Sequence, residues 1–274
     1  MATKADWQDA TGKVWARSFN RTDRAFSGLT QIMLERLSGI PGDAILDIGC
    51  GAGELSIALA STRPKARTVG IDVSQELVAA ATRRGSGITN LGFACADAAT
   101  WSDPSFQPDL ITSRHGVMFF DDPVSAFANF HAIAQAGAHL LFSCFRASSL
   151  NPWVAEPSRL LDLPPPVDPF APGPFAFADE DRTRSILSKA GWRDIAFEPV
   201  DFGFVVGSGD DPTADALEFF RKIGPPARVL HEMDDAARED ALGRIARSLA
   251  GKQHDGGVLV LPASAWIVTA RKPA

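Results

Sequence analysis

The sequence of 274 residues has no tyrosine, only three cysteines and no long basic run. Without tyrosine, no phenolic side chain can act as a catalytic base. The cysteines are Cys50, Cys95 and Cys144, and no metal-ligand spacing links them. All three fall in expected strands or at their ends, where we expect them to be buried. An odd number of buried thiols is typical of a reducing compartment, so the sequence predicts a cytoplasmic protein.

Positive charge and long hydrophobic runs are also scarce. The net charge is −6 and the pI about 5.4, which argues against a nucleic-acid partner because such binding depends on neutralising phosphates. No apolar stretch approaches membrane-spanning length, and residues 1–6 do not resemble a signal peptide, so no membrane association is expected. With 45% hydrophobic and 22% charged residues, the chain is globular, either one large domain or one domain with a lobe built from insertions.

Residues 44–60 carry the clearest signal. An apolar run that contains Asp47 leads into a glycine-dense turn, and a helical pattern follows. Strand, glycine turn and helix form the opening of a nucleotide-binding βαβ unit. The glycines occupy alternate positions: Gly49, Gly51 and Gly53. A dinucleotide fingerprint would instead need a glycine where Glu54 stands. The spacing favours a turn that passes an amino-acid and ribose portion, and glycine lets the backbone lie against such a ligand.

Two further acids follow later strands. Residues 68–71 form a short β-type run that ends in Asp72, and residues 91–96 form another that ends at Asp97. The first acid is placed to accept hydrogen bonds from both hydroxyls of a ribose, and the second could accept from an adenine amino group. Each acid could instead cap the helix that follows it. Because acids recur at three successive strand ends, we interpret them together as a nucleoside site.

These ordered motifs resemble those of class I S-adenosylmethionine-dependent methyltransferases, in the small-molecule branch called type 11 or type 25. The resemblance covers residues 41–146 and is carried by these segments: 45–53, 70–72, 95–98, 108–111 and 113–123. It implies an α/β fold with a doubly wound, Rossmann-like sheet of seven strands, the last one antiparallel between the fifth and the sixth. It also implies S-adenosyl-L-methionine as cofactor, S-adenosyl-L-homocysteine as product and methyl transfer as the reaction.

Other segments are expected to surround this core. We divide the chain as follows: residues 1–40 form a helical segment over the cofactor, 41–146 the cofactor-binding core, 147–178 a lid rich in proline and aromatic residues, 179–206 a core helix and strand, 207–257 a helical insertion, and 258–274 the final strand. The lid is too rich in proline for a helix or strand. Residues 224–226 are expected to form a turn between two helices. The two insertions could jointly form a cap lobe over the crevice where open α/β sheets bind ligands.

The resemblance also implies roles for individual residues. Those expected at the cofactor are Asp47, Gly49, Cys50, Gly51, Gly53, Asp72, Val73, Asp97, Ala98, Ser113 and Arg114. Asp72 would hold the ribose, Val73 would pack on the adenine, and Asp97 would bind its edge. Those expected at the methyl acceptor are Trp15, Phe19, His115, Phe119 and Trp153. The aromatic residues among them could alternatively belong to the core of the lobe.

His115 is the candidate catalytic residue. It departs from the resembling family, which more often has a phenylalanine at this position. As a base near neutral pH, a histidine could take a proton from a hydroxyl or an activated carbon acid. The alternative is a ring that lines the pocket and is hydrogen-bonded to the backbone.

Motifs that the sequence lacks limit the class of methyl acceptor. No N-P-P-Y or D-P-P-Y motif follows the fourth strand, and Ser113 and Cys144 do not supply the carboxylates of a divalent-metal catechol site, so no metal is expected. The aromatic lid favours a small, apolar or aromatic acceptor, methylated on an oxygen or a carbon atom. Two alternatives stay open: a nicotinamide-dependent oxidoreductase and a non-catalytic nucleoside-binding regulatory protein. The insertion helices could mediate dimerisation, although no pattern supports it.

Overall fold

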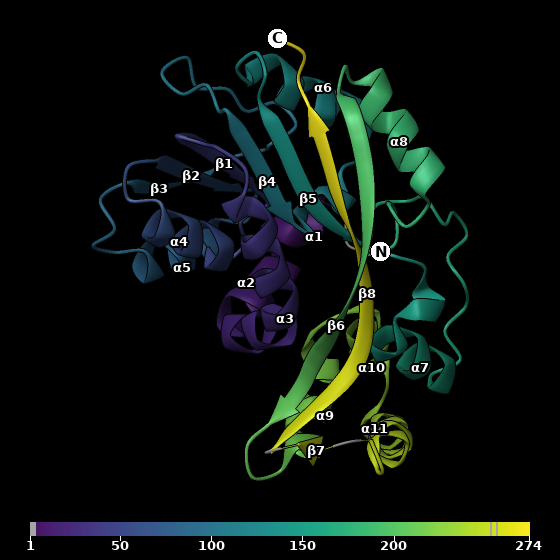
Figure 1. The fold of residues 1–274 in the computed structure, drawn as a ribbon. Coiled ribbons are helices and arrows are strands. Elements are labelled where there is room, and N and C mark those ends of the chain that lie inside the picture. Colours follow the sequence, from purple (N-terminus) through teal and green to yellow (C-terminus); the bar gives the residue numbers. More distant parts are fainter. Residues whose placement is uncertain (1–3, 253, 256) are drawn as a thin grey trace.

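The computed structural model describes residues 4–252, 254–255 and 257–274. A single mixed sheet lies at its centre, with the strand order β3-β2-β1-β4-β5-β8-β6 (Figure 1). The parallel strands are β1 (Ala44–Ile48), β2 (Arg67–Asp72), β3 (Leu91–Cys95), β4 (Leu110–Arg114) and β5 (His139–Phe145). β8 (Val258–Arg271) lies antiparallel between β5 and β6 (Arg193–Ser208), and the short β7 (His254–Asp255) pairs with it. The predicted doubly wound sheet with its antiparallel last strand is confirmed.

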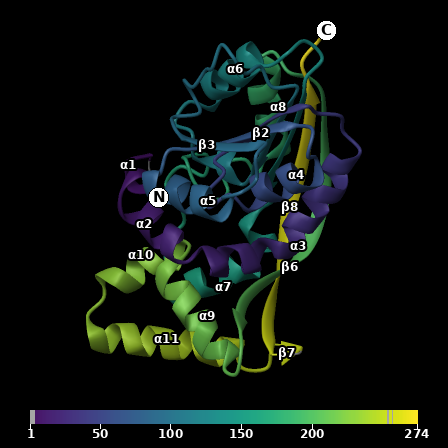
Figure 2. The same cartoon turned by 90° about the vertical axis from the view of Figure 1, so that its left-hand side faces the viewer.

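Helices cover both faces of this sheet, as right-handed crossovers require. α3 (Phe19–Ser38), α4 (Glu54–Thr62) and α5 (Gln75–Arg84) lie on one face, and α6 (Pro123–Ile133) and α8 (Glu180–Lys189) pack together on the other (Figures 1 and 2). Side-chain caps begin three of these helices. The hydroxyl of Ser74 accepts from the Leu77 N–H at α5, and Asp122 and Asp179 accept in the same way at α6 and α8.

A lobe extends beyond the sheet on a long two-stranded ribbon. β6 has 16 residues and β8 has 14, and their pairing continues to Ser208↔Val258, far past the end of β5 (Figure 1). Four helices surround the ribbon: α7 (Pro152–Leu160), α9 (Pro212–Lys222), α10 (Pro225–Glu232) and α11 (Asp235–Leu249). α1 (Lys4–Gln8) and α2 (Ala10–Arg17) lie with α3 between the sheet and this lobe (Figure 2).

Two proline-rich segments form helices that the sequence did not predict. α7 lies inside the segment judged too rich in proline, and α10 begins at the expected turn, with Pro225 and Pro226 in its first positions. The first turn of a helix needs no N–H donors, so proline is favoured there, as at Pro152. Pro157 removes one hydrogen bond from α7, and burial of the neighbouring Trp153 offsets that loss.

The burial of the cysteines and the positions of the N-terminal helices differ in part from what the sequence predicts. Cys50 and Cys144 are buried, but Cys95 is exposed, because β3 lies at the edge of the sheet. The N-terminal helical segment consists of three helices: the long α3 begins at Phe19, and α1 and α2 precede it. No helix within the described ranges is long and apolar enough to cross a membrane.

Candidate functional site

A cavity of about 380 Å³ opens at the carboxyl ends of the parallel strands, where the order of the sheet reverses between β1 and β4. Ligands of open α/β sheets bind at such a switch point. The residues that line it come from the N-terminal helices, the glycine turn, the ends of β2 and β4, and the lobe. Most of the predicted site residues are among them: Trp15, Asp47, Gly49, Cys50, Gly51, Asp72, Val73, Asp97, Ala98, Arg114, His115, Phe119 and Trp153.

The glycine turn presents bare backbone to this cavity. Gly49, Gly51 and Gly53 all have positive φ angles, of 61°, 56° and 86°, which side chains rarely tolerate. A Cβ atom on Gly49 would lie 2.8 Å from the Cα of Gly116, so the two loops touch there. A Cβ atom on Gly51 would meet nothing within 4 Å, and Gly51 lines the cavity. Gly53 instead packs against Phe93 and Ala81 beneath the turn and does not line the cavity.

Asp72 joins the end of β2 to the glycine turn. One carboxylate oxygen accepts from the Gly51 N–H at 2.9 Å, and the other accepts from the Ser74 N–H at 2.9 Å. Burial raises the pKa of this carboxyl, and the backbone donors oppose that rise. The helix cap that was the alternative reading belongs to Ser74 rather than to Asp72. Each carboxylate oxygen keeps a lone pair with which to accept from hydroxyls in the cavity.

Asp47 lies underneath the same turn. Its side chain is fully buried and accepts a hydrogen bond of 2.5 Å from the Ser56 hydroxyl at the start of α4. Desolvation raises the pKa of Asp47 to about 7, against the opposing hydrogen bond. Asp47 thus ties the turn to the helix that follows it.

The residues expected around the adenine lie on the cavity as well. Val73 follows Asp72, and Asp97 and Ala98 follow β3. The Asp97 carboxylate accepts from the Ala99 N–H at 3.0 Å, which turns the chain immediately after the strand. Leu77 of α5 adds an apolar side chain beside Val73. The cavity here is thus lined by one carboxylate and several apolar side chains.

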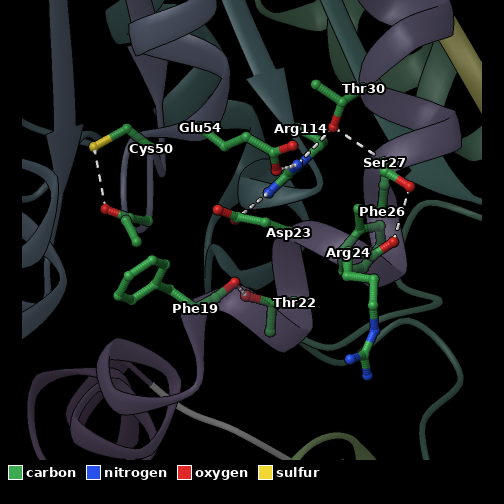
Figure 3. A network of polar contacts seen from close by, with 12 residues as sticks. Phe19, Thr22, Asp23, Arg24, Phe26, Ser27, Thr30, Cys50, Glu54 and Arg114 are labelled. Carbon is green, nitrogen blue, oxygen red and sulfur yellow. Dashed lines mark hydrogen bonds and ion pairs between the residues drawn. The ribbon is translucent and has the colours of Figure 1, made fainter. Parts of the chain in front are cut away.

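Arg114 stands in a network of charges that links the core to the N-terminal helices (Figure 3). Its guanidinium donates to the Glu54 carboxylate and, at 2.6 Å, to the Thr30 hydroxyl. Asp23 of α3 lies 3.9 Å from the same guanidinium and accepts from Arg84 of α5 at 2.5 Å. Burial raises the pKa of Glu54, and Arg114 opposes that rise. Arg114 therefore reaches the cavity with its charge already paired.

Besides Gly53, two predicted residues do not line the cavity. Ser113 is buried and donates to the Ile48 carbonyl at 2.6 Å, while its oxygen accepts from the Gly116 N–H, so it braces β4 against β1. The ring of Phe19 lies 4.4 Å below the guanidinium of Arg84, turned away from the cavity. The sequence does not distinguish Phe19 from Trp15, because the break between α2 and α3 at Ser18 separates them in the structure and has no clear signal in the sequence.

His115 occupies a strained backbone position at the end of β4. Its φ of 62° is uncommon for a residue with a side chain. Two contacts with Ser143 of β5 hold it: its N–H donates to the Ser143 carbonyl at 3.2 Å, and its Nδ1 lies 2.6 Å from the Ser143 hydroxyl. Its Nε2 is buried and has no hydrogen-bond partner among the residues that the structure describes. Strain of this kind persists only where the surroundings hold it, and it clusters at functional sites.

The pKa of His115 is lower than the sequence predicted. Burial holds it well below its usual range, and the neighbouring positive charge of Arg114 lowers it further. The imidazole is therefore neutral at pH 7 rather than poised to titrate there.

Several lining residues escaped the sequence analysis. They are aromatic or acidic side chains from distant parts of the chain: Trp7, Asp23, Phe26, Phe145 and Phe204. Trp7 could have been found from the sequence, because it stands near Trp15 and the chain has six tryptophans. In the structure its ring packs edge-on against both Trp15 and Phe119. The others depend on how the lobe and α3 close over the sheet, which no local pattern reveals.

No cluster of three or more potential metal ligands occurs within residues 4–252, 254–255 and 257–274. Asp121 and Asp122 are adjacent carboxylates on the cavity, but Asp122 accepts from the Ser125 N–H and hydroxyl as a helix cap.

Residues 45–137 match the family model described as a methyltransferase domain. Curated relatives include a malonyl-[acyl-carrier protein] O-methyltransferase of Marinomonas, 26% identical over 49% of this chain and 53% of that protein. A trans-aconitate 2-methyltransferase of Streptomyces avermitilis is 42% identical over 30% of this chain and 32% of that protein. The matched segment thus spans about half or less of these relatives' own lengths, so the likeness defines the domain rather than the activity of the whole protein.

Solved structures extend the likeness of the fold. Phosphoethanolamine N-methyltransferase 2 of Haemonchus contortus, solved with S-adenosyl-L-methionine, has a TM-score of 0.57 at 17% identity and covers 100% of this chain and 61% of that one. The [4+2]-cyclase SpnF has a TM-score of 0.52 at 20% identity over 90% and 80% of the two chains. Fold alone therefore does not decide the chemistry.

The chain thus contains a class I S-adenosylmethionine-dependent methyltransferase domain. The resemblance drawn from the sequence is confirmed, and with it the cofactor of this class of domain. The bare Gly51 backbone and the Asp72 carboxylate at the mouth of the cavity fit that cofactor.

Proposed function

We propose that this protein is a methyltransferase that uses S-adenosyl-L-methionine to methylate an oxygen or carbon atom of a small, apolar organic acceptor. One arrangement carries the proposal. The Asp72 carboxylate accepts from the Gly51 N–H at 2.9 Å, beside glycine backbone that faces an open cavity at the switch point of the sheet. This arrangement presents an acceptor for ribose hydroxyls next to a turn that leaves room for an amino-acid portion.

Individual residues take the following roles in this proposal. Gly49, Cys50 and Gly51 pass the methionine portion, Asp72 holds the ribose, and Val73, Asp97 and Ala98 enclose the adenine. Gly53, Asp47 and Ser113 brace the turn and the strand ends from beneath, since their contacts point that way. When bound, the cofactor supplies a methyl group that needs no further activation, so the protein mainly aligns the acceptor and excludes water.

The acceptor half of the site is supported by the lobe. Trp153 of α7, Phe204 of β6 and Ile223 after α9 line the same cavity as the glycine turn. Trp15 and Phe119 complete it from the N-terminal side, whereas Phe19 is not proposed as a contact. The named relatives act on acceptors as different as a malonyl carrier protein and trans-aconitate. We therefore infer the acceptor from the residues that line this cavity and not from the substrates of the relatives.

Calorimetric titration with S-adenosyl-L-homocysteine, run beside NADH, tests the cofactor. We expect micromolar binding of S-adenosyl-L-homocysteine alone, because Glu54 stands where a dinucleotide turn needs a glycine. Binding of NADH alone would reverse the proposal in favour of an oxidoreductase. Cofactor binding without methyl transfer to any of a panel of phenols and enols would favour the non-catalytic alternative.

A further inference from the structure

One side of the cavity is a continuous wall of rings, formed by Phe26, Phe145, Trp153 and Phe204. The indole of Trp153 stacks on Phe204 with ring centres 4.4 Å apart, and the ring centre of Phe145 lies 5.2 Å from that of Trp153. Phe26 packs edge-on against Phe204 at 5.1 Å. These rings give one side of the cavity an apolar, aromatic lining, which suits an apolar aromatic ligand.

The polar atom of this aromatic wall points away from the cavity. The Trp153 N–H donates to the Asn151 side chain at 3.3 Å, and Asn151 is itself fully buried. Gly224 closes over the indole, because a Cβ atom on it would lie 3.5 Å from the ring. The wall therefore offers a ligand no hydrogen bond of its own.

His115 provides the polar atom that the aromatic wall lacks. Its ring centre lies 4.1 Å from Phe145 and 5.3 Å from Phe26, so the imidazole adjoins the aromatic wall directly. His115 lines the cavity, and its Nε2 is buried without a partner in the described part of the chain. A buried polar atom left unpaired costs free energy, and a ligand group that bonds to it recovers that cost.

We propose that the acceptor is an uncharged, planar molecule that lies on the aromatic wall and donates its hydroxyl hydrogen to Nε2 of His115. This inference rests on the proposed function, since it describes the substrate of the same site. A charged carboxylate is a poor fit. Among the described residues that line the cavity, the one lysine or arginine is Arg114, whose charge is already paired with Glu54.

Ser143 is the positioning residue for this contact. It lies beside the end of β4 in the sheet, paired with Arg114, and it contacts both the backbone and Nδ1 of His115. A serine hydroxyl can accept from Nδ1–H as well as donate. When Nδ1 carries the hydrogen and donates it to Ser143, the lone pair of Nε2 is free to accept from the substrate.

The neutral state of His115 fits a reaction in which the substrate hydroxyl gives its proton to Nε2 only as the O–C bond forms. The pKa of His115 is held well below its usual range by burial and by Arg114, so an imidazolium is unfavourable before reaction. In the step proposed, the O–C bond forms as the S–C bond breaks with its electron pair left on sulfur, and the hydroxyl proton passes to Nε2 and then to water. An acidic hydroxyl, phenolic or enolic, meets this requirement best.

Binding of 2-naphthol and of naphthalene to protein saturated with S-adenosyl-L-homocysteine tests the contact without turnover. We expect 2-naphthol to bind about tenfold more tightly than naphthalene, because only the naphthol can satisfy Nε2. 2-Methoxynaphthalene, which accepts but cannot donate, should bind no more tightly than naphthalene. The preference should hold from pH 6 to pH 8, and the bound ligand should show the absorption of neutral naphthol.

Variants of three residues locate the effect. His115→Phe should abolish the preference while naphthalene still binds, and Ser143→Ala should reduce it by freeing the imidazole. His131→Phe is the matched control, because His131 also has a buried, unpartnered Nε2 but lies outside the cavity. A preference that survives His115→Phe would overturn the proposal, as would equal binding of 2-methoxynaphthalene and 2-naphthol. Failure to bind S-adenosyl-L-homocysteine itself would instead remove the proposed function.

Discussion

Asp47 is a carboxyl group kept away from water by the elements that form the cofactor site. It lies below the glycine turn, accepts from Ser56, and has its pKa raised to about 7 by burial. Its ordinary pKa is 3.8, so between these values the folded protein holds a proton that the unfolded chain has lost. Stability from this group is therefore fully present at acid pH and is lost as the pH rises toward 7.

Replacing Asp47 by asparagine should remove that dependence, because the amide oxygen still accepts from Ser56 and never ionises. At pH 8 we expect Asp47→Asn to have a free energy of unfolding up to about 4 kcal/mol larger than that of the original protein, and so to unfold at a higher temperature. At pH 4 the two proteins should differ little. Thermal unfolding at several pH values checks this. Asp210→Asn, at an exposed turn, serves as the control. An equal pH dependence in both variants would contradict the assignment.

The fully buried side chain of Asn151 connects α7 of the lobe to β8 of the sheet. Asn151 precedes α7, and its amide nitrogen donates to the carbonyls of Arg146, Ala147 and Ser264 at 3.1 to 3.2 Å. Its oxygen accepts from the Ser264 N–H at 3.0 Å and from Trp153. Asn151 thus holds the first turn of α7, and with it the aromatic wall, against β8.

Asn151→Ala should lower the free energy of unfolding by at least about 3 kcal/mol, because it leaves several buried groups without partners. It should also weaken binding of 2-naphthol severalfold while S-adenosyl-L-homocysteine binds as before. Asn90→Ala is the matched control: Asn90 also donates to three carbonyls, those of Ala60, Arg63 and Ala66, but far from α7. Equal loss of 2-naphthol binding in both variants would show that α7 does not shape the acceptor side.

At this scale the sequence predicts some elements well and others poorly. The core strands and the caps at Ser74, Asp122 and Asp179 follow from local patterns, and the structure has them. α7 and α10 were missed because proline is read as a breaker, whereas at the first turn of a helix it is favourable. The resemblance implied that the last strand lies beside the sixth, but the continuation of this pairing into a long ribbon was missed, because it joins residues from 50 (Ser208 and Val258) to 78 (Arg193 and Arg271) positions apart.

Across the whole molecule, the two halves of the site differ in how far sequence could reveal them. The cofactor half follows a single βαβ pattern, so Gly51 and Asp72 could be named from their spacing. The acceptor half joins Phe26, His115 and Phe204, which come together only when α3, β4 and the ribbon pack. The arrangement of these side chains and the buried Nε2 atom are products of that packing. The sequence indicated His115, Trp15, Phe119 and Trp153 as residues, but not how they lie relative to one another.

A cofactor that joins the N-terminal helices, the core and the glycine turn should stabilise the protein as a whole. At a concentration of one hundred times its dissociation constant, S-adenosyl-L-homocysteine should add about 2.7 kcal/mol to the free energy of unfolding, which corresponds to a rise of about 5 °C in Tm. Asp72→Ala, which removes a charged acceptor, should weaken binding about tenfold and so halve that rise at the same ligand concentration.

The size of the rise, and not the Tm of the free variant, is the quantity to compare, because Asp72 also supports the Gly51 and Ser74 backbone. Asp210→Asn should keep the full rise. NADH at the same concentration should give none, since the turn lacks the glycine that a pyrophosphate requires. A full rise in Asp72→Ala would mean that the ribose is held elsewhere along the cavity, and the proposed contacts of Val73 and Asp97 would then need to be reassigned with it.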